Sequence, residues 1–210
     1  MDTKEQFVSA YKLISRDGAD RLFNHLENGG FFEDPASAKK HMSKPGGLCE
    51  HSLNVYRRLR WLCEAEAMKN MEFKAPSVET IAIVSLLHDV CKMGTYRTEY
   101  KNQKNYDPEK VSRASRYQVK RDTLGAFVWE TVPGYSFDDP FPYGHGEKSV
   151  YIIQSYMKLL PEEGFAIRYH MGPWNDGEKN GANAAFTMYE LALLLHMADE
   201  FATFVDEKDK

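Results

Sequence analysis

Six side chains of types that bind transition metals stand where predicted helices face a core: His51, His88, Asp89, His145, His170 and Asp199. The pair His88 and Asp89 lies near the end of the most apolar helical segment of the chain, residues 81–91. Asp199 falls on the apolar line of the last predicted helix. A carboxylate that is buried without a partner costs several kcal/mol, so the two aspartates need a positive partner in the core.

A divalent cation would satisfy these carboxylates and histidines together. Imidazole and carboxylate ligands favour Mn, Fe, Zn, Co or Ni over Ca, and helices from distant parts of a chain can bring such ligands into one bundle core. A single histidine on an apolar face is usually a hydrogen-bonded core residue, and Asp199 alone could pair with Arg168 or Lys92. Six positions on the core sides of five helices favour the metal site. Three histidines fall outside this pattern and are expected to be surface, loop or structural residues: His25, His41 and His196.

Helical patterns dominate the elements that must position these residues. Apolar residues spaced three and four apart predict helices at 3–14, 17–27, 48–72, 145–159, 161–171 and 185–204. Another helix is expected to start at Pro76 or Ser77, to contain the apolar run 81–91 and to end before Gly94. Residues 31–47 and 172–184 are rich in loop-forming residues, and the charged tail 206–210 is expected to be frayed.

Residues 95–144 lack this helical periodicity and carry many Tyr, Lys, Arg, Asp and Pro residues. Within them, segments 115–121 and 126–132 alternate and could pair as a β-hairpin around residues 122–125. We therefore expect a small irregular or β-hairpin excursion from a helical body, placed where a lid or a substrate-contacting element could lie.

Length and composition favour one domain, residues 1–210, with a sizeable core, because 42% of the residues are hydrophobic. The net charge of −4 disfavours tight sequence-independent binding to duplex nucleic acid. No apolar run approaches the roughly 18 residues of a membrane span, and the polar N-terminus does not resemble a signal peptide. The three cysteines lack metal-binding spacing and indicate reduced thiols. We expect a soluble cytoplasmic protein without membrane partners.

Five motifs of the chain resemble, in order, the pieces of an HD-domain phosphohydrolase: GGLCEH (46–51), LLHDVCK (86–92), YGHGEKS (143–149), RYHMG (168–172) and LLLHMADEF (193–201). The resemblance covers residues 46–204 and is strongest to bacterial HD-domain exoribonucleases and related small HD hydrolases. It implies an all-α fold, the HD-domain helical bundle, in which residues 95–144 form the excursion.

The resemblance also implies two groups of metal ligands: His51, His88, Asp89 and Asp199 for one ion, and His145 and His170 for a second, with Asp89 bridging. A site of this kind holds one or two divalent transition-metal ions (Mn, Fe, Ni, Co or Zn). Two bridged cations lie roughly 3.5–4 Å apart and activate a water for attack on a phosphoester.

Lys92 stands one helical turn after His88 and is expected to act beside Asp89 in catalysis and to bind substrate phosphate. Its alternative role is that of a solvated lysine at a helix end. Arg97 and Arg168 are expected to contact the substrate, although Arg168 could instead orient a ligand histidine.

Basic and aromatic residues alternate in the excursion: Tyr96, Arg97, Tyr100, Lys101, Lys104, Tyr106, Arg113, Arg116, Tyr117, Lys120 and Arg121. They could clamp phosphates and stack a base. The ordinary alternative is a solvated loop surface.

These features favour a phosphohydrolase that acts on a nucleotide, a cyclic dinucleotide or a short oligonucleotide, so its partner would be a small phosphoester or short single-stranded nucleic acid. The alternative is a di-iron HD-type oxygenase acting on a small polar substrate, because the ligand spacings also resemble that group. A non-catalytic binding module is the third possibility, and the intact set of six ligands argues against it.

Overall fold

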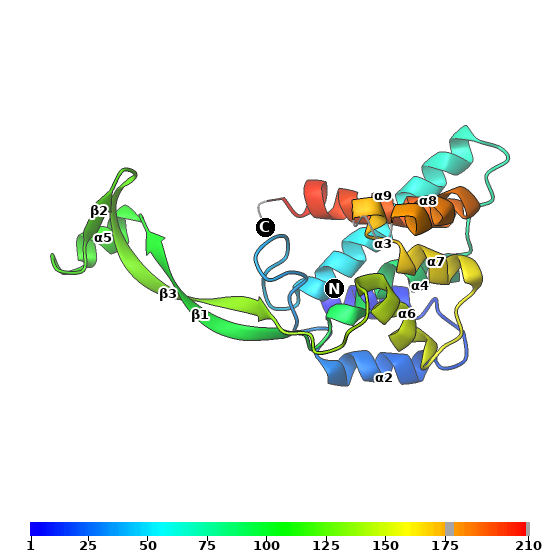
Figure 1. Cartoon of the computed structure of the whole chain (residues 1–210), viewed down its shortest axis with the longest axis horizontal. Helices are drawn as coiled ribbons and strands as arrows, with labels where there is room; N and C mark the ends of the chain where they lie inside the picture. The colour runs from blue at the N-terminus through cyan, green and yellow to red at the C-terminus, as the bar shows by residue number, and fades with distance from the viewer. Residues whose placement is uncertain (175–178, 209–210) are drawn as a thin grey trace.

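The computed structural model describes residues 1–174 and 179–208. A helical body contains α1 (Thr3–Tyr11), α2 (Ala19–Gly29), α3 (Gly47–Lys69), α4 (Val78–Leu87), η1 (Val90–Lys92), α6 (His145–Gln154), α7 (Pro161–Arg168), η2 (Gly172–Trp174), α8 (Lys179–Met188), α9 (Glu190–Phe201) and the π-helical turn η3 (Ala202–Asp206). A long ribbon built from β1 (Tyr96–Asn105), α5 (Pro108–Arg113), β2 (Lys120–Asp122) and β3 (Gly125–Phe137) projects from this body (Figure 1). The expected helical fold with a β excursion is confirmed.

Helix α4 is the centre of the body, and every residue from Thr80 to Leu87 is buried. The Ser77 hydroxyl oxygen caps its start by accepting a hydrogen bond from the backbone N–H of Thr80 at 3.0 Å. The helix packs against α3 and α7 and ends at His88, where the chain tightens into η1. Because α4 is buried, His88 and Asp89 at its end lie in the interior of the body.

Close packing at two glycines brings other elements to the same region. A Cβ atom on Gly47 would lie 2.0 Å from the Met42 carbonyl oxygen, so the loop before α3 can fold onto the first turn of that helix only with glycine there. A Cβ atom on Gly146 would lie 2.3 Å from the Arg168 carbonyl oxygen, so α6 starts in direct contact with the end of α7. These contacts place His51 and His145 near the end of α4.

The C-terminal region differs from the sequence-based prediction. The expected loop 172–184 is wrong in its second half, because α8 begins at Lys179, while residues 175–178 lie outside the described residues. The expected helix 185–204 is divided at Tyr189 into α8 and α9. The expected frayed tail is wrong for residues 206–208, because η3 turns Glu207 inward, where its side chain is buried against His51 and Asn54, while residues 209–210 lie outside the described residues.

The ribbon is a three-stranded antiparallel sheet in the order β1-β3-β2. Strand β1 pairs over its whole length with β3, from Tyr96 opposite Phe137 to Asn105 opposite Val128. The short strand β2 pairs with the start of β3, so the expected hairpin around residues 122–125 exists. The longer partner strand β1 was not expected, because its side chains are exposed on both faces and show no apolar alternation.

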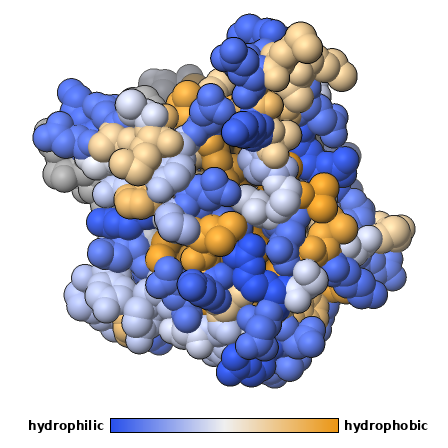
Figure 2. Space-filling model, turned by 90° about the vertical axis from the view of Figure 1, so that its right-hand side faces the viewer, coloured by the Kyte–Doolittle hydropathy of each residue, from blue (hydrophilic) through white to orange (hydrophobic). Residues whose placement is uncertain are grey.

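The side of the body that faces away from the ribbon is mainly polar (Figure 2). The end opposite the ribbon carries mostly hydrophilic side chains with small hydrophobic patches between them (Figure 2). No helix in the described part of the chain combines the length and apolar character that crossing a bilayer requires.

An ion pair inside the body anchors the start of α7. The fully buried Glu163 carboxylate accepts a hydrogen bond from Arg16 Nη2 at 3.0 Å, another from the Thr80 hydroxyl at 3.0 Å and a third from the backbone N–H of Leu160 at 2.7 Å. These bonds join the segment after α1, the start of α4 and the start of α7, which leads to His170.

Replacing Glu163 by glutamine is expected to lower the free energy of unfolding by about 3 kcal/mol. The loss lies at the lower end of the range for a broken buried pair because the Arg16 side chain keeps 19% exposure. Urea denaturation of the chelator-treated protein measures it, with Glu162→Gln as the control at the neighbouring, less buried position. Equal stability of the two variants would show that the Arg16 pair does not anchor α7.

Candidate metal centre

Residues from five parts of the body converge on one buried cluster, which holds all six predicted ligands. His51 comes from the second turn of α3, and its Nε2 atom lies 3.2 Å from Asp199 Oδ1 and 3.3 Å from His88 Nε2. His51, His88, Asp89 and His170 are almost completely buried, and Asp199 is 8% exposed. His145, the first residue of α6, is the most accessible of the six, with 32% of its side chain exposed.

Asp89 occupies the middle of this cluster, and its two carboxylate oxygens face different histidines. Oδ1 lies 2.7 Å from His145 Nε2 and 3.5 Å from His170 Nε2. Oδ2 lies 3.5 Å from the Nε2 atoms of both His51 and His88. The carboxylate therefore stands between two pairs of imidazoles, which is the arrangement of a ligand shared by two cations.

Backbone carbonyls hold two of the rings with Nε2 toward the centre. His88 Nδ1 lies 2.8 Å from the Ser85 carbonyl oxygen, and His170 Nδ1 lies 2.7 Å from the Ile167 carbonyl oxygen. Donation from Nδ1 to these carbonyls leaves each Nε2 as a lone-pair acceptor. Among the described residues, His170 Nε2 has no hydrogen-bond partner although it is buried. Acceptor nitrogens that face carboxylates fit a bound cation, which would satisfy both.

The charges of the cluster without a cation follow from burial and close contacts. Burial alone would raise the pKa values of Asp89 and Asp199, but Lys92 and the histidines hold them below the usual range of a carboxyl group. Burial lowers the pKa of His88 to about 3. Burial also acts to lower the pKa of His51, but hydrogen bonds to Asp199 and Glu207 raise it to about 10. The centre therefore contains two ionised carboxylates, a neutral His88 and a protonated His51 at neutral pH.

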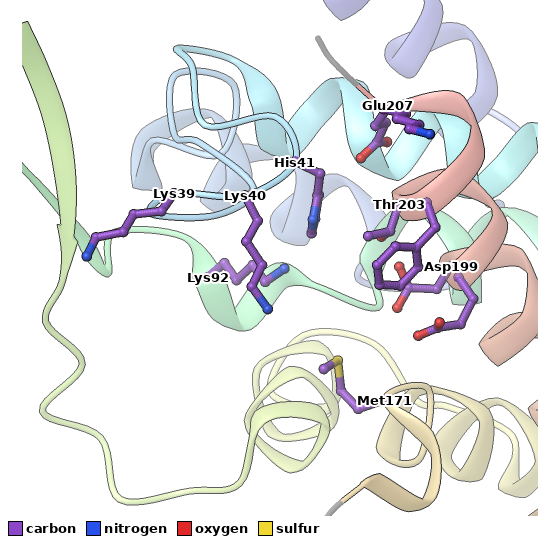
Figure 3. A pocket seen from close by; sticks show the side chains of 11 residues that line it. Lys39, Lys40, His41, Lys92, Met171, Asp199, Thr203 and Glu207 are labelled. Atoms are coloured by element: carbon purple, nitrogen blue, oxygen red, sulfur yellow. The ribbon is translucent and has the colours of Figure 1, made fainter. Parts of the chain in front are cut away.

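Lys92 lies at the edge of the cluster, with its Nζ atom 2.6 Å from Asp89 Oδ2. It borders two cavities, one of about 470 Å³ beside Asp199 and one of about 320 Å³ beside His145. Figure 3 shows the first cavity, where Lys40, His41 and Lys92 lie across from Asp199 and Thr203. The two cavities therefore border the cluster at different predicted ligands, Asp199 and His145.

The structure does not bring the two arginines of the sequence-based prediction to these cavities. Arg97 is exposed on β1 and pairs with Asp138. Arg168 lies against the ring of Tyr169 and 3.8 Å from Glu147 Oε1. As far as the described residues define the cavities, neither arginine lines them.

Two residues at the site were missed by reasoning from the sequence. Glu207 lies 3.1 Å from His51 Nδ1, and its place two helical turns after Asp199 was an available signal. The His41 ring lies 4.9 Å from the His51 ring, and its two nitrogens are buried without hydrogen-bond partners among the described residues. His41 stands in a loop without periodicity, so nothing in the pattern pointed to it.

Replacing Glu207 by glutamine is expected to weaken metal binding by about 10- to 100-fold, because a carboxylate on Nδ1 orients a ligand histidine and raises its basicity. Competition with a chelating dye measures the affinity. Asp206→Asn is the control, since it removes the neighbouring carboxylate that pairs with Arg58. Unchanged affinity in the Glu207 variant would mean that His51 does not depend on this partner.

Comparison with known proteins points to one family. Residues 48–132 match the model of the family described as HD domain. The match includes His51, His88 and Asp89, whereas His145, His170 and Asp199 lie beyond it. No curated protein and no solved structure matches the chain.

Proposed function

Because the chain contains an HD domain, we propose that it is a metal-dependent phosphohydrolase that cleaves a phosphoester of a nucleotide or a short oligonucleotide. The observation that carries the proposal is the position of Asp89, whose two carboxylate oxygens face two separate pairs of histidines. This arrangement suits two divalent cations that share one carboxylate.

The proposed ligands fall into two groups: His51, His88, Asp89 and Asp199 for the first ion, and Asp89, His145 and His170 for the second. The donor set suits Mn, Fe, Ni, Co or Zn. Divalent cations bound there supply Lewis acidity toward phosphoryl oxygens and lower the pKa of water toward neutrality. The protein fixes the ligands in advance through the carbonyls of Ser85 and Ile167 and through Glu207.

Lys92 is proposed to hold a phosphate of the substrate. Burial alone would lower the pKa of Lys92, but Asp89 raises it above its ordinary value, so the ammonium stays charged. Its position on both cavities lets it reach an anion bound on either side. Lys39 and Lys40 line the larger cavity and add positive charge at its entrance, which favours an anionic substrate.

The proposal predicts hydrolysis of a generic phosphodiester, bis-p-nitrophenyl phosphate, by protein supplied with Mn²⁺, followed by turnover within a panel of nucleotides and short oligonucleotides. Oxygen consumption by the Fe²⁺-loaded protein is measured on the same preparation. Release of nitrophenol that requires added metal supports the phosphohydrolase. Absence of hydrolysis throughout the panel, together with oxygen consumption on a small polar substrate, would replace it by the di-iron oxygenase.

A further inference from the structure

One face of the ribbon is aromatic. Side chains opposite one another in an antiparallel pair point to the same side, so the even-numbered residues of β1 share a face with the odd-numbered residues of β3. The aromatic members of this face are Tyr96, Tyr100, Phe127, Trp129, Tyr135 and Phe137. We call it the aromatic face.

Three of these rings are open to solvent. Tyr100 is 75% exposed, Trp129 is 54% exposed and Phe137 is 58% exposed. The ribbon that carries them projects from the helical body (Figure 1). Several exposed aromatic rings on one face form the kind of apolar surface that marks an interaction site.

Positive charge is concentrated on the same element. Between residues 96 and 137 the chain has eight Lys and Arg residues against five Asp and Glu residues, whereas the remainder of the chain carries a net charge of −7. At the far end of the ribbon, Arg116, Lys120 and Arg121 form no ion pair among the described residues. A cavity of about 600 Å³ lies there, where Trp129 stands beside Arg113, Gln118 and Lys120.

The aromatic face is continuous with the metal centre. At the base of the ribbon, the rings of Tyr96 and Phe137 lie 5.7 Å apart. Phe137 also lines the cavity that contains Lys92 and His145. An extended ligand that contacts the rings from Trp129 toward the body would therefore reach the candidate active site.

We propose that the aromatic face binds single-stranded nucleic acid, with bases stacked on Trp129, Tyr100 and Phe137 and phosphates held by cations at the far end of the ribbon. Stacked rings combined with unpaired cations are the physical basis of sequence-tolerant single-strand binding. A second copy of this chain is disfavoured as the occupant, because it would bring two positively charged ribbons together. The proposed binding of single-stranded nucleic acid does not depend on the proposed function. The inference that the bound nucleic acid is the substrate rests on the proposed function.

The test measures binding of a fluorescein-labelled oligothymidylate of about 20 nucleotides by fluorescence anisotropy, with the full chain in EDTA so that no hydrolysis occurs. Trp129→Ala is expected to weaken binding by at least about 5-fold, since it removes one stacked base. Lys120→Glu is expected to weaken binding by a similar factor and to reduce its dependence on salt.

Two matched controls accompany these variants. Trp61 on α3 has the same exposed fraction as Trp129, 54%, but lies on the body, so Trp61→Ala is expected to bind like the wild type. Lys74→Glu changes the charge of an exposed lysine between α3 and α4 and is also expected to have no effect. Circular dichroism verifies that each variant is folded.

Equal weakening by Trp61→Ala and Trp129→Ala, or binding weaker than about 100 µM at physiological salt, would overturn the inference. A concentration-dependent dimer that Trp129→Ala dissociates would assign the face to a second copy instead. Hydrolysis of the generic diester without oligonucleotide binding would overturn this inference and leave the proposed function intact.

Discussion

Replacing Asp89 by asparagine is expected to empty the metal centre and to reduce turnover by at least about 10³-fold, since a single preorganised electrostatic contact in an active site is already worth 10²–10³. The amide keeps the shape of the side chain but removes the negative charge that stands between the two pairs of histidines. Metal analysis after gel filtration and initial rates on the diester measure the two effects.

The Asp89→Asn variant is also expected to lower the stability of the fold, and a second substitution can separate this effect from the loss of activity. Without the Asp89 carboxylate, the Lys92 ammonium loses its partner at 2.6 Å in a nearly buried position, which is expected to cost about 3–5 kcal/mol. Adding Lys92→Met removes the uncompensated charge, so the double variant is expected to regain stability without regaining metal or activity. A double variant that recovers turnover would show that Asp89 acts only as the partner of Lys92.

Asp139→Asn provides the matched control. Asp139 is a partly buried aspartate that, like Asp89, forms an ion pair with a lysine, here Lys148 at 2.8 Å, and it lines the cavity beside His145. It lies outside the cluster of histidines and is expected to retain bound metal after neutralisation. Equal loss of metal from the Asp89 and Asp139 variants would argue against a specific ligand role for Asp89.

Metal affinity is expected to rise by up to about tenfold per pH unit between pH ~6.5 and the pKa of His51, about 10. The metal-free protein carries a proton on His51, and a cation must displace it to use Nε2. His88, with a pKa lowered to about 3, is neutral throughout this range and adds no such dependence. Chelator competition at several pH values measures the slope, and an affinity independent of pH would contradict protonation of His51.

The stability of the metal-free protein is expected to decline on both sides of pH ~6.5, the ordinary pKa of an unfolded histidine. The raised pKa of His51 contributes stability that is complete below pH ~6.5 and is lost as the pH rises toward about 10. The lowered pKa of His88 acts oppositely, and its contribution is lost as the pH falls from ~6.5 toward about 3.

Metal loading is expected to abolish the alkaline decline, because the bound protein holds no proton on His51. Urea midpoints at pH 7 and pH 9.5, with and without metal, measure this difference. The variant His51→Asn serves as a control, and its metal-free form is expected to lack the decline. A wild-type decline that persists after loading would contradict the placement of His51 at the metal.

The helices that carry His88, Asp89 and Asp199 could be predicted from the sequence, because the apolar pattern of each helix shows which of its residues are buried. A helix that is apolar on all sides must be central, so His88 and Asp89 at its end had to enter the core. Asp199 on the buried line of α9 had to find a partner. The structure brings these residues together with the other three histidines in one cluster around Asp89.

Three features were not predicted from the sequence, because they depend on local backbone geometry and not on the pattern of apolar residues. The π-helical turn η3 changes the direction of the last residues and buries Glu207 in what reads as a charged tail. The strand β1 is exposed on both faces, so its pairing with β3 leaves no alternation to detect. His41 reaches the cluster only because the loop before α3 folds back over Gly47.

We propose that the cluster around Asp89 holds metal ions that the protein uses to hydrolyse a phosphoester. The most direct measurement strips the protein with a chelator and returns Mn²⁺ in steps, following bound metal and diester hydrolysis in the same samples. We expect that activity is absent in the stripped protein, rises in proportion to bound metal and saturates at one or two ions per chain, and that Asp89→Asn gains neither metal nor activity. Full hydrolysis by the stripped protein, or equal metal binding by the Asp89 variant, would contradict it.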